Sequence, residues 1–157
     1  MFTYMYIAEV KLFMDLSWTG SATHFSLWGF IALYMILLGW IVAQRSLLTL
    51  QGKFAANEFS TTGEEISPLA QRLCRAHANL YESFPVWGGF FLMAIVTDST
   101  SITNGLAVFL LLARIGQIVT HLISTSALAV TIRFVFFSIQ FLIAMYWIVG
   151  FARKFFT

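Results

Sequence analysis

Long apolar runs dominate this sequence and restrict the folds that are open to it. The first run, HFSLWGFIALYMILLGWIVA, extends from His24 to about Ala43, and its 20 residues can cross a bilayer core of about 30 Å as a helix. Three further runs cover about 68–96, 102–123 and 128–150. Since lipid satisfies no backbone hydrogen bonds, such runs cross as helices. The sequence therefore predicts an all-α integral membrane protein, a bundle of four transmembrane helices.

The composition agrees with this class of protein. The chain has 157 residues, of which 59% are hydrophobic and 10% charged, with a mean hydropathy of +0.82. Soluble domains are about 25% charged. Four spans leave little chain for anything else, so residues 1–157 form one expected domain. A net charge of +2 from scattered Lys and Arg argues against nucleic acid as a partner.

The single cysteine, Cys74, excludes an internal disulfide and a cysteine-built metal site; we expect no metal. A thiol beside two arginines can be reactive, although an incidental small apolar residue is the simpler interpretation.

The connections between the runs differ in length and charge. Residues 1–23 are expected to be an N-terminal extension, because Glu9, Lys11 and Asp15 interrupt them; they also make a poor secretory signal. The first loop is the longest polar stretch, and Ser67-Pro68 at its end suits a helix start. The short STSA connection predicts that the last two spans form an antiparallel hairpin.

Basic residues give a first view of the topology. Arg45, Lys53, Arg72 and Arg75 lie in or beside the first loop, whereas the loop between the second and third spans has no basic residue. The positive-inside bias therefore places the first loop in the cytoplasm and both termini outside. Arg153 and Lys154 argue for the opposite orientation.

Polar residues inside three spans follow helical spacing, so that each set lies along one helix face. The second span carries Arg72, Arg75, Asn79 and Glu82, at spacings of 3, 4 and 3. The third carries Arg114, Gln117, His121 and Ser124 with the same spacings, and the fourth carries Arg133 and Gln140.

These faces hold more positive than negative charge. An arginine near the centre of a span costs roughly 2.5 to 3.5 kcal/mol if it faces lipid, so Arg114 and Arg133 must face each other, a partner subunit or a wet cavity. Glu82 is the only acid on the three faces, and it cannot neutralise Arg75, Arg114 and Arg133 alone. The excess positive charge favours an anionic ligand.

A structural interpretation stands beside this one. Polar residues within a membrane also join helices, which applies most directly to Asn79 and Gln140. His24 is expected at the membrane interface, and His77 lies off the polar face. His121 lies on that face, where a histidine could titrate near neutral pH, so it is a candidate for contact with a ligand.

The stretch RLCRAHANLYESFPVW, residues 72–87, resembles the second-helix signature of the MAPEG family, the membrane-associated proteins in eicosanoid and glutathione metabolism. That signature has an arginine-rich start, an R-A-H/Q-x-N-x-x-E core and an aromatic-Pro ending. The matching residues are Arg75, Ala76, His77, Asn79, Glu82, Phe84 and Pro85. Chain length, four spans, the long first loop and an arginine in each of the last two spans also agree, as in a bacterial-type member of the inner membrane; only residues 1–23 fall outside the resemblance.

The resemblance implies a homotrimer that binds glutathione between subunits at the cytosolic end. Arg75, Asn79 and Glu82 then match the residues that hold the glutathione peptide, and Arg114 matches an arginine of the third helix. Arg72, Gln117 and His121 complete the expected binding set. Arg45 and Arg133 match positions near the glutathione thiol, and are the candidate catalytic residues.

Glutathione fits the charge pattern, because its carboxylates suit the arginines and its amine suits Glu82. An arginine near the sulfur would favour the thiolate, which could attack a lipophilic electrophile or hydroperoxide arriving from the bilayer. Three positions depart from the family pattern. His121 replaces a tyrosine of many relatives, Gln117 replaces a histidine of some, and Phe134 replaces the serine of the prostaglandin-forming branch, which argues against an eicosanoid synthase.

The sequence therefore predicts a glutathione-dependent membrane transferase or peroxidase. One alternative is a non-catalytic membrane protein whose polar faces serve assembly or bind another anion such as a lipid headgroup. A second alternative is a small ion-coupled transporter with Glu82 as the carrier carboxylate, which the excess of arginines disfavours.

Overall fold

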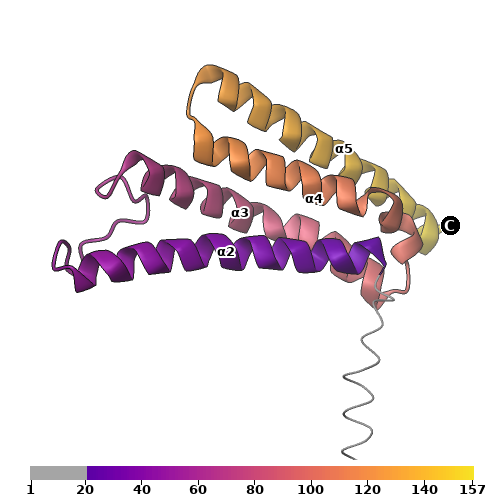
Figure 1. Cartoon of the computed structure of the whole chain (residues 1–157). Helices are drawn as coiled ribbons and strands as arrows, with labels where there is room; N and C mark the ends of the chain where they lie inside the picture. Colours follow the sequence, from indigo (N-terminus) through magenta and orange to yellow (C-terminus); the bar gives the residue numbers. More distant parts are fainter. Residues whose placement is uncertain (1–20) are drawn as a thin grey trace, which may run out of the picture.

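The computed structural model describes residues 21–157, and these residues form helices with no strand. The four helices are α2 (Ala22–Leu50), α3 (Pro68–Val96), α4 (Thr100–Ile123) and α5 (Ala127–Phe156) (Figure 1). The predicted all-α class is confirmed. Most of the predicted N-terminal extension, residues 1–20, lies outside the described residues.

Helix α3 covers the residues predicted for the second span. Pro68 occupies its first turn, and the Ser67 hydroxyl accepts a 3.0 Å hydrogen bond from the Ala70 backbone N–H. This side chain satisfies one of the amides that a helix start leaves unpaired. The signal of Ser67 followed by Pro68 was thus sufficient to place the start of the helix.

The other helices are longer than the apolar runs. Helix α2 continues from about Ala43 to Leu50, because QRSLLTL contains no helix breaker; the chain turns at Gly52, whose φ is +67°. Glycine adopts this conformation at little cost. Helix α5 likewise continues beyond Gly150 to Phe156. The first loop is therefore shorter than the polar stretch that follows the first apolar run.

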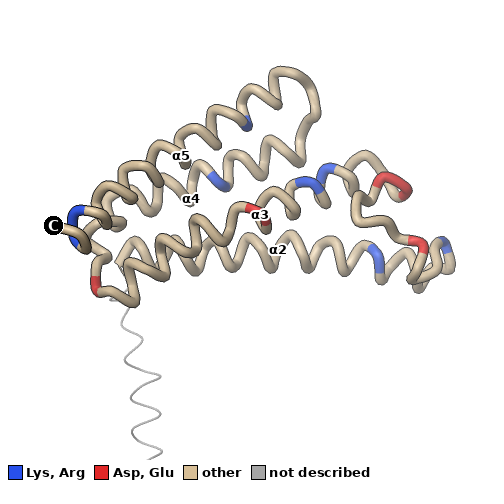
Figure 2. The backbone as a smooth tube through the Cα atoms, turned by 180° about the vertical axis from the view of Figure 1, so that it is seen from behind, with Lys and Arg blue, Asp and Glu red and all other residues tan. Residues whose placement is uncertain are grey.

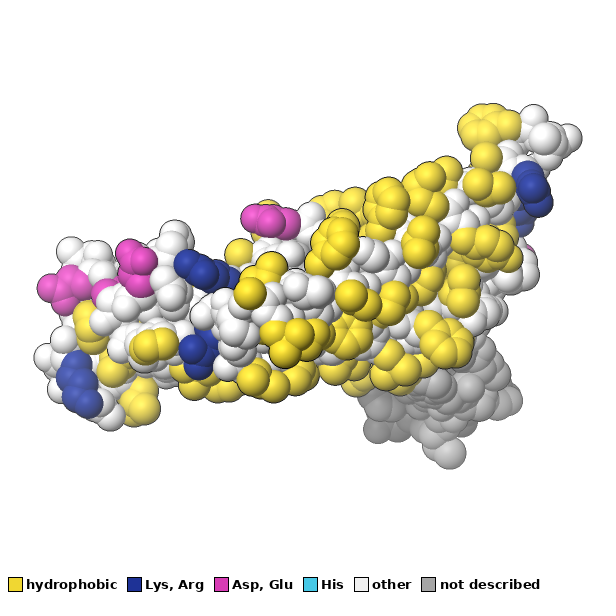
Figure 3. Space-filling model, turned by 90° about the horizontal axis from the view of Figure 1, so that it is seen from above, with side chains coloured by type: hydrophobic (Ala, Val, Ile, Leu, Met, Phe, Trp, Pro, Cys, Tyr) yellow, Lys and Arg dark blue, Asp and Glu magenta, His cyan; other side chains and the backbone are white. Residues whose placement is uncertain are grey.

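Three of the four described helices, α2, α4 and α5, are long and apolar enough to cross a membrane. Helix α3 carries more polar residues and packs against both α2 and α4. Exposed apolar side chains cover much of the molecule between charged ends (Figure 3). This distribution suits a bundle surrounded by lipid.

The core is aromatic at its centre. Phe91 of α3 makes edge-to-face contacts with Phe30 of α2 and Trp147 of α5, with ring centroids 5.8 Å and 5.5 Å apart. All three side chains are completely buried. These contacts join α2, α3 and α5. Aromatic pairs in this geometry stabilise the fold beyond the burial of their surface.

One end of the bundle is fixed by polar contacts. Thr23 donates a 2.7 Å hydrogen bond to the Asn104 side chain, and Lys154 donates a 2.6 Å hydrogen bond to Ser99. The pair formed by α2 and α3 and the pair formed by α4 and α5 lie close together at this end and diverge toward the first loop (Figures 1 and 2). The polar face of α3 lies along this divergent half.

Candidate functional site

Arg114 is the most enclosed polar residue of the predicted site. Its side chain is 0% exposed, and it donates hydrogen bonds of 2.8 Å to Asn79 Oδ1 and 2.7 Å to Ser83 Oγ. Its guanidinium carbon also lies 6.0 Å from the centre of the Phe30 ring. Within residues 21–157 no carboxylate bonds to this group, so its charge is held only by neutral partners and by the Phe30 ring.

Asn79, Glu82 and Ser83 form one wall of an open cleft of about 380 Å³ between α3 and α5. The opposite wall consists of Phe137 and Phe141, whose rings stack with centroids 6.3 Å apart. Val86 and Trp87 extend the first wall with apolar surface. The cleft therefore combines polar groups on α3 with an aromatic surface on α5.

Two members of the α3 polar face are exposed. Arg75 and Glu82 make no hydrogen bond or ion pair with another described residue. They point away from the core of the single chain. Their charges are free to bind a ligand or a neighbouring subunit.

Arg72 has a different environment from the rest of that face. Its Nε donates a 2.8 Å hydrogen bond to the Leu122 carbonyl, which belongs to the last turn of α4. The final carbonyls of a helix have no partner within the helix, and a cation there also suits the helix dipole. Arg72 therefore joins α3 to the end of α4.

The predicted residues of α4 and α5 meet in two pairs. Gln140 donates a 3.0 Å hydrogen bond to Gln117 Oε1, and Arg133 Nη1 lies 2.9 Å from His121 Nδ1. Gln117 and Gln140 are buried, whereas His121 and Arg133 are half-buried.

The basic side chains gather around His121. Arg133, Arg114 and Arg75 all lie close enough to act on it electrostatically. In Figure 2, one blue segment within α4 and one within α5 mark basic residues inside these helices. Each of the three predicted polar faces thus contributes an arginine to the same region.

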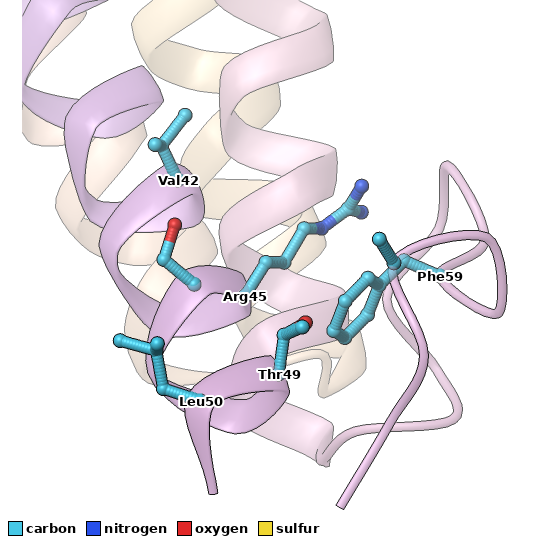
Figure 4. A pocket seen from close by; sticks show the side chains of 7 residues that line it. Val42, Arg45, Thr49, Leu50 and Phe59 are labelled. Atoms are coloured by element: carbon cyan, nitrogen blue, oxygen red, sulfur yellow. The ribbon is translucent and has the colours of Figure 1, made fainter. Parts of the chain in front are cut away.

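Arg45 does not join this region within one chain. It lies on the opposite side of α3, where Nη2 donates a 2.6 Å hydrogen bond to the Ser60 carbonyl and lies 3.9 Å from the buried Cys74 sulfur. Its guanidinium also stacks on Phe59, 5.4 Å from the ring centre. Figure 4 shows this contact beside an open pocket of about 500 Å³ at the end of α2.

The first loop is organised around Glu65 next to this arginine. The Ser60 side-chain hydroxyl and the Ser60 backbone N–H both donate hydrogen bonds to the Glu65 carboxylate. These bonds hold the pKa of Glu65 below its usual value of 4.5, and the charge of Arg45 lowers that pKa further. Within one chain, Arg45 therefore holds the first loop against α2 through Ser60 and Phe59.

Sequence reasoning missed Ser83, Phe137 and Phe141. Ser83 follows Asn79 by one helical turn, so the spacing rule that identified Asn79 could have included it. The two phenylalanines carry no polar signal and become part of the cleft only through the packing of α5. Among the described residues no group of three or more His, Cys, Asp or Glu could hold a metal ion.

Comparison with known proteins adds one finding. The sequence model of the MAPEG family matches residues 25–153, which is most of the chain. Searches of curated proteins and of solved structures gave no match.

Proposed function

The chain belongs to the MAPEG family, a membrane family associated with glutathione-dependent chemistry, and from this premise we propose that it is a glutathione-dependent transferase or peroxidase. The observation that carries the proposal is the cleft between α3 and α5, in which polar residues face an aromatic wall. Such a cleft suits a polar thiol on one side and a lipophilic molecule on the other.

The α3 face supplies the groups that glutathione requires. Glutathione carries two carboxylates and an amine, so that Arg75 suits a carboxylate and Glu82 suits the amine. Both side chains are exposed and have no partner among residues 21–157. Asn79 adds a neutral hydrogen-bonding group between them.

Arg133 is the candidate for activation of the thiol. A free thiol has a pKa of about 8.5 and is only a few per cent ionised at neutral pH. A nearby guanidinium stabilises the thiolate and lowers this pKa. In the transferase reaction the thiolate of bound glutathione would form a C–S bond and displace a leaving anion from the electrophilic carbon. In the peroxidase reaction it would attack a hydroperoxide oxygen, the O–O bond would break and release an alcohol, and a second glutathione would reduce the resulting sulfenic acid to glutathione disulfide and water.

Arg45 could activate the glutathione thiol only in an assembly of subunits. It lies on the α2 side of α3, bonded to Ser60, and so is separated from Arg133 within one chain. We propose that Arg45 contributes to the cleft of a neighbouring subunit in a homotrimer, as the family resemblance implies. Because the exposed Arg75 and Glu82 lie on the surface of the single chain, a neighbouring subunit could complete their surroundings.

The second substrate is expected to be lipophilic. Phe137 and Phe141 line the cleft and are themselves partly exposed, at 41% and 50%. A molecule dissolved in the bilayer could reach them along α5 without crossing water. The protein would contribute orientation and electrostatic stabilisation to the reaction.

The same premise suggests a location. We propose a multi-pass protein of the bacterial inner membrane, with the first loop in the cytoplasm. The basic residues Arg45, Lys53 and Arg72 lie at the end that carries this loop, which supports that orientation. Glutathione would then enter the cleft from the cytosolic side.

A non-catalytic role in membrane assembly is the second candidate. It is favoured by contacts that join helices without any ligand, namely those between Gln117 and Gln140 and between Arg72 and Leu122. Under this alternative, Arg75→Ala and Glu82→Ala would break the oligomer rather than weaken the affinity for glutathione.

The test is an activity assay on the purified full chain in lipid. Glutathione conjugation to a lipophilic electrophile and glutathione-dependent reduction of a fatty-acid hydroperoxide are measured for the wild type and Arg133→Ala. We expect activity in one of the assays and its loss in the variant. If the wild type shows no activity and no glutathione-dependent thermal shift, the proposed function is wrong.

A further inference from the structure

We propose that Arg114 and Ser83 fix the orientation of the Asn79 amide, so that the cleft always presents an amide N–H donor beside the carboxylate of Glu82. This inference rests on the proposed function, since it concerns how the same cleft recognises glutathione. Arg114 would then be a positioning residue that acts through Asn79, because its own side chain is completely enclosed.

The chemistry of arginine decides the orientation. A guanidinium has only donors, so any atom that bonds to it must be an acceptor. Asn79 lies 2.8 Å from Arg114 Nη1 and must turn its Oδ1 toward it. The amide NH₂ then faces away from Arg114, and it makes no hydrogen bond with a described residue.

Ser83 holds the guanidinium in place. Its hydroxyl accepts a 2.7 Å bond from Arg114 Nη2. It donates its single proton to the backbone carbonyls of its own helix, at 2.7 Å from that of Asn79 and 3.1 Å from that of Leu80. The proton of this hydroxyl is therefore already used. Although Ser83 lines the cleft, it serves Arg114 rather than a ligand.

The fixed amide selects one arrangement of ligand groups. Asn79 offers a donor, and Glu82, three residues later on the same face, offers an acceptor. The positive charge of Arg114 behind the amide strengthens the donor and favours an anionic acceptor. A carboxylate and an ammonium carried close together match this pair, as on the α-amino acid end of glutathione; its glycine end carries a carboxylate alone.

Three variants separate positioning from simple packing. Asn79→Asp keeps an acceptor for Arg114 but removes the donor that faces the cleft. Arg114→Lys keeps a side chain that can only donate, whereas Arg114→Gln can also accept and so releases the amide to turn. Asn104→Asp is the matched control, because the Asn104 Oδ1 also accepts hydrogen bonds but lies at the other end of the bundle.

Glutathione is titrated into the full-length protein in nanodiscs, and the Tm of each variant is measured in parallel. We expect Asn79→Asp to weaken binding by about tenfold or more, the effect of losing one charge-assisted hydrogen bond, with an unchanged or higher Tm. Arg114→Lys should bind more tightly than Arg114→Gln, and Asn104→Asp should bind like the wild type.

Two results would overturn the inference while leaving the proposed function intact. One is an Asn79→Asp variant that binds glutathione as tightly as the wild type. The other is equal binding by Arg114→Lys and Arg114→Gln, with affinity following Tm in every variant. A wild-type protein that does not bind glutathione overturns both the inference and the proposed function.

Discussion

Gln140 of α5 donates a 3.0 Å hydrogen bond to Gln117 of α4, and the two side chains are 0% and 4% exposed. Gln140 Nε2 also bonds to the Phe136 carbonyl, whereas its Oε1 is buried without a partner. The pair therefore joins two helices and leaves little surface for a ligand. This favours a structural role for Gln117, which the sequence suggested as a ligand-binding residue.

A double-mutant cycle tests that role. Gln140→Leu leaves the Gln117 Oε1 without its donor, and Gln117→Leu leaves Gln140 Nε2 with the Phe136 carbonyl as its remaining acceptor. The double variant removes both amides together. We expect a coupling energy of about 0.6 kcal/mol, and at most about 1.7, as for other hydrogen bonds between membrane helices. The measurement is unfolding in mixed micelles, and additive single effects would contradict the prediction.

Ser83→Ala should destabilise the fold more than the loss of a single hydroxyl group would suggest. The change leaves Arg114 Nη2 without an acceptor inside the bundle, at a cost of about 1.5 kcal/mol. Ser138→Ala is the matched control, because the Ser138 hydroxyl bonds only to the Phe134 carbonyl of its own helix. Its effect should stay within about 0.5 kcal/mol, and equal losses in the two variants would remove Arg114 from the explanation.

Arg133→Gln should change the pH dependence of any glutathione reaction. Removal of the guanidinium takes away a charge that stabilises the thiolate, so the pKa of the bound thiol should rise. Activity is then expected to fall most strongly at neutral pH and to recover as the pH increases. Arg153→Gln, near the C-terminus, should leave the pH-rate profile unchanged; a uniform loss at every pH in Arg133→Gln would mean that the side chain does not act on the thiol.

The first loop should lose stability in acid through Glu65. Since hydrogen bonds from Ser60 hold the folded pKa of this carboxylate below 4.5, the stabilisation is present above 4.5 and is lost as the pH falls through the folded value. The Tm of the wild type should therefore exceed that of Glu65→Gln at neutral pH, and the difference should vanish in acid.

Glu64→Gln is the control for this prediction, because Glu64 makes only a 3.5 Å contact with Gln71. Its Tm should follow that of the wild type across the same range. A difference between the wild type and Glu65→Gln that does not depend on pH would show that the charge of Glu65 has no part in holding the loop.

The sequence was most informative where a local signal coincides with the fold. Ser67 and Pro68 placed the start of α3, and helical spacing placed Asn79 and Arg114 on faces that meet. Both inferences depend on backbone chemistry and helix geometry, which residue order determines directly.

Features that depend on packing between helices were not predictable in the same way. The sequence suggested Arg45 as a residue near the glutathione thiol; within one chain α2 places it against Ser60 and Cys74, and its place in an assembly stays a prediction. Phe137 faces the cleft only because α5 lies opposite α3. The end of α2 at Leu50 was also missed, since a polar composition does not by itself end a helix.

Native mass spectrometry of the full chain, released from nanodiscs with glutathione present, tests the central claim most directly, because one spectrum shows both the oligomer and its ligand. We predict a wild-type trimer that carries glutathione, and a Glu82→Gln variant that remains a trimer but loses the ligand. A wild type without glutathione, or a Glu82→Gln variant that dissociates into monomers, would contradict the claim that this face is a glutathione site.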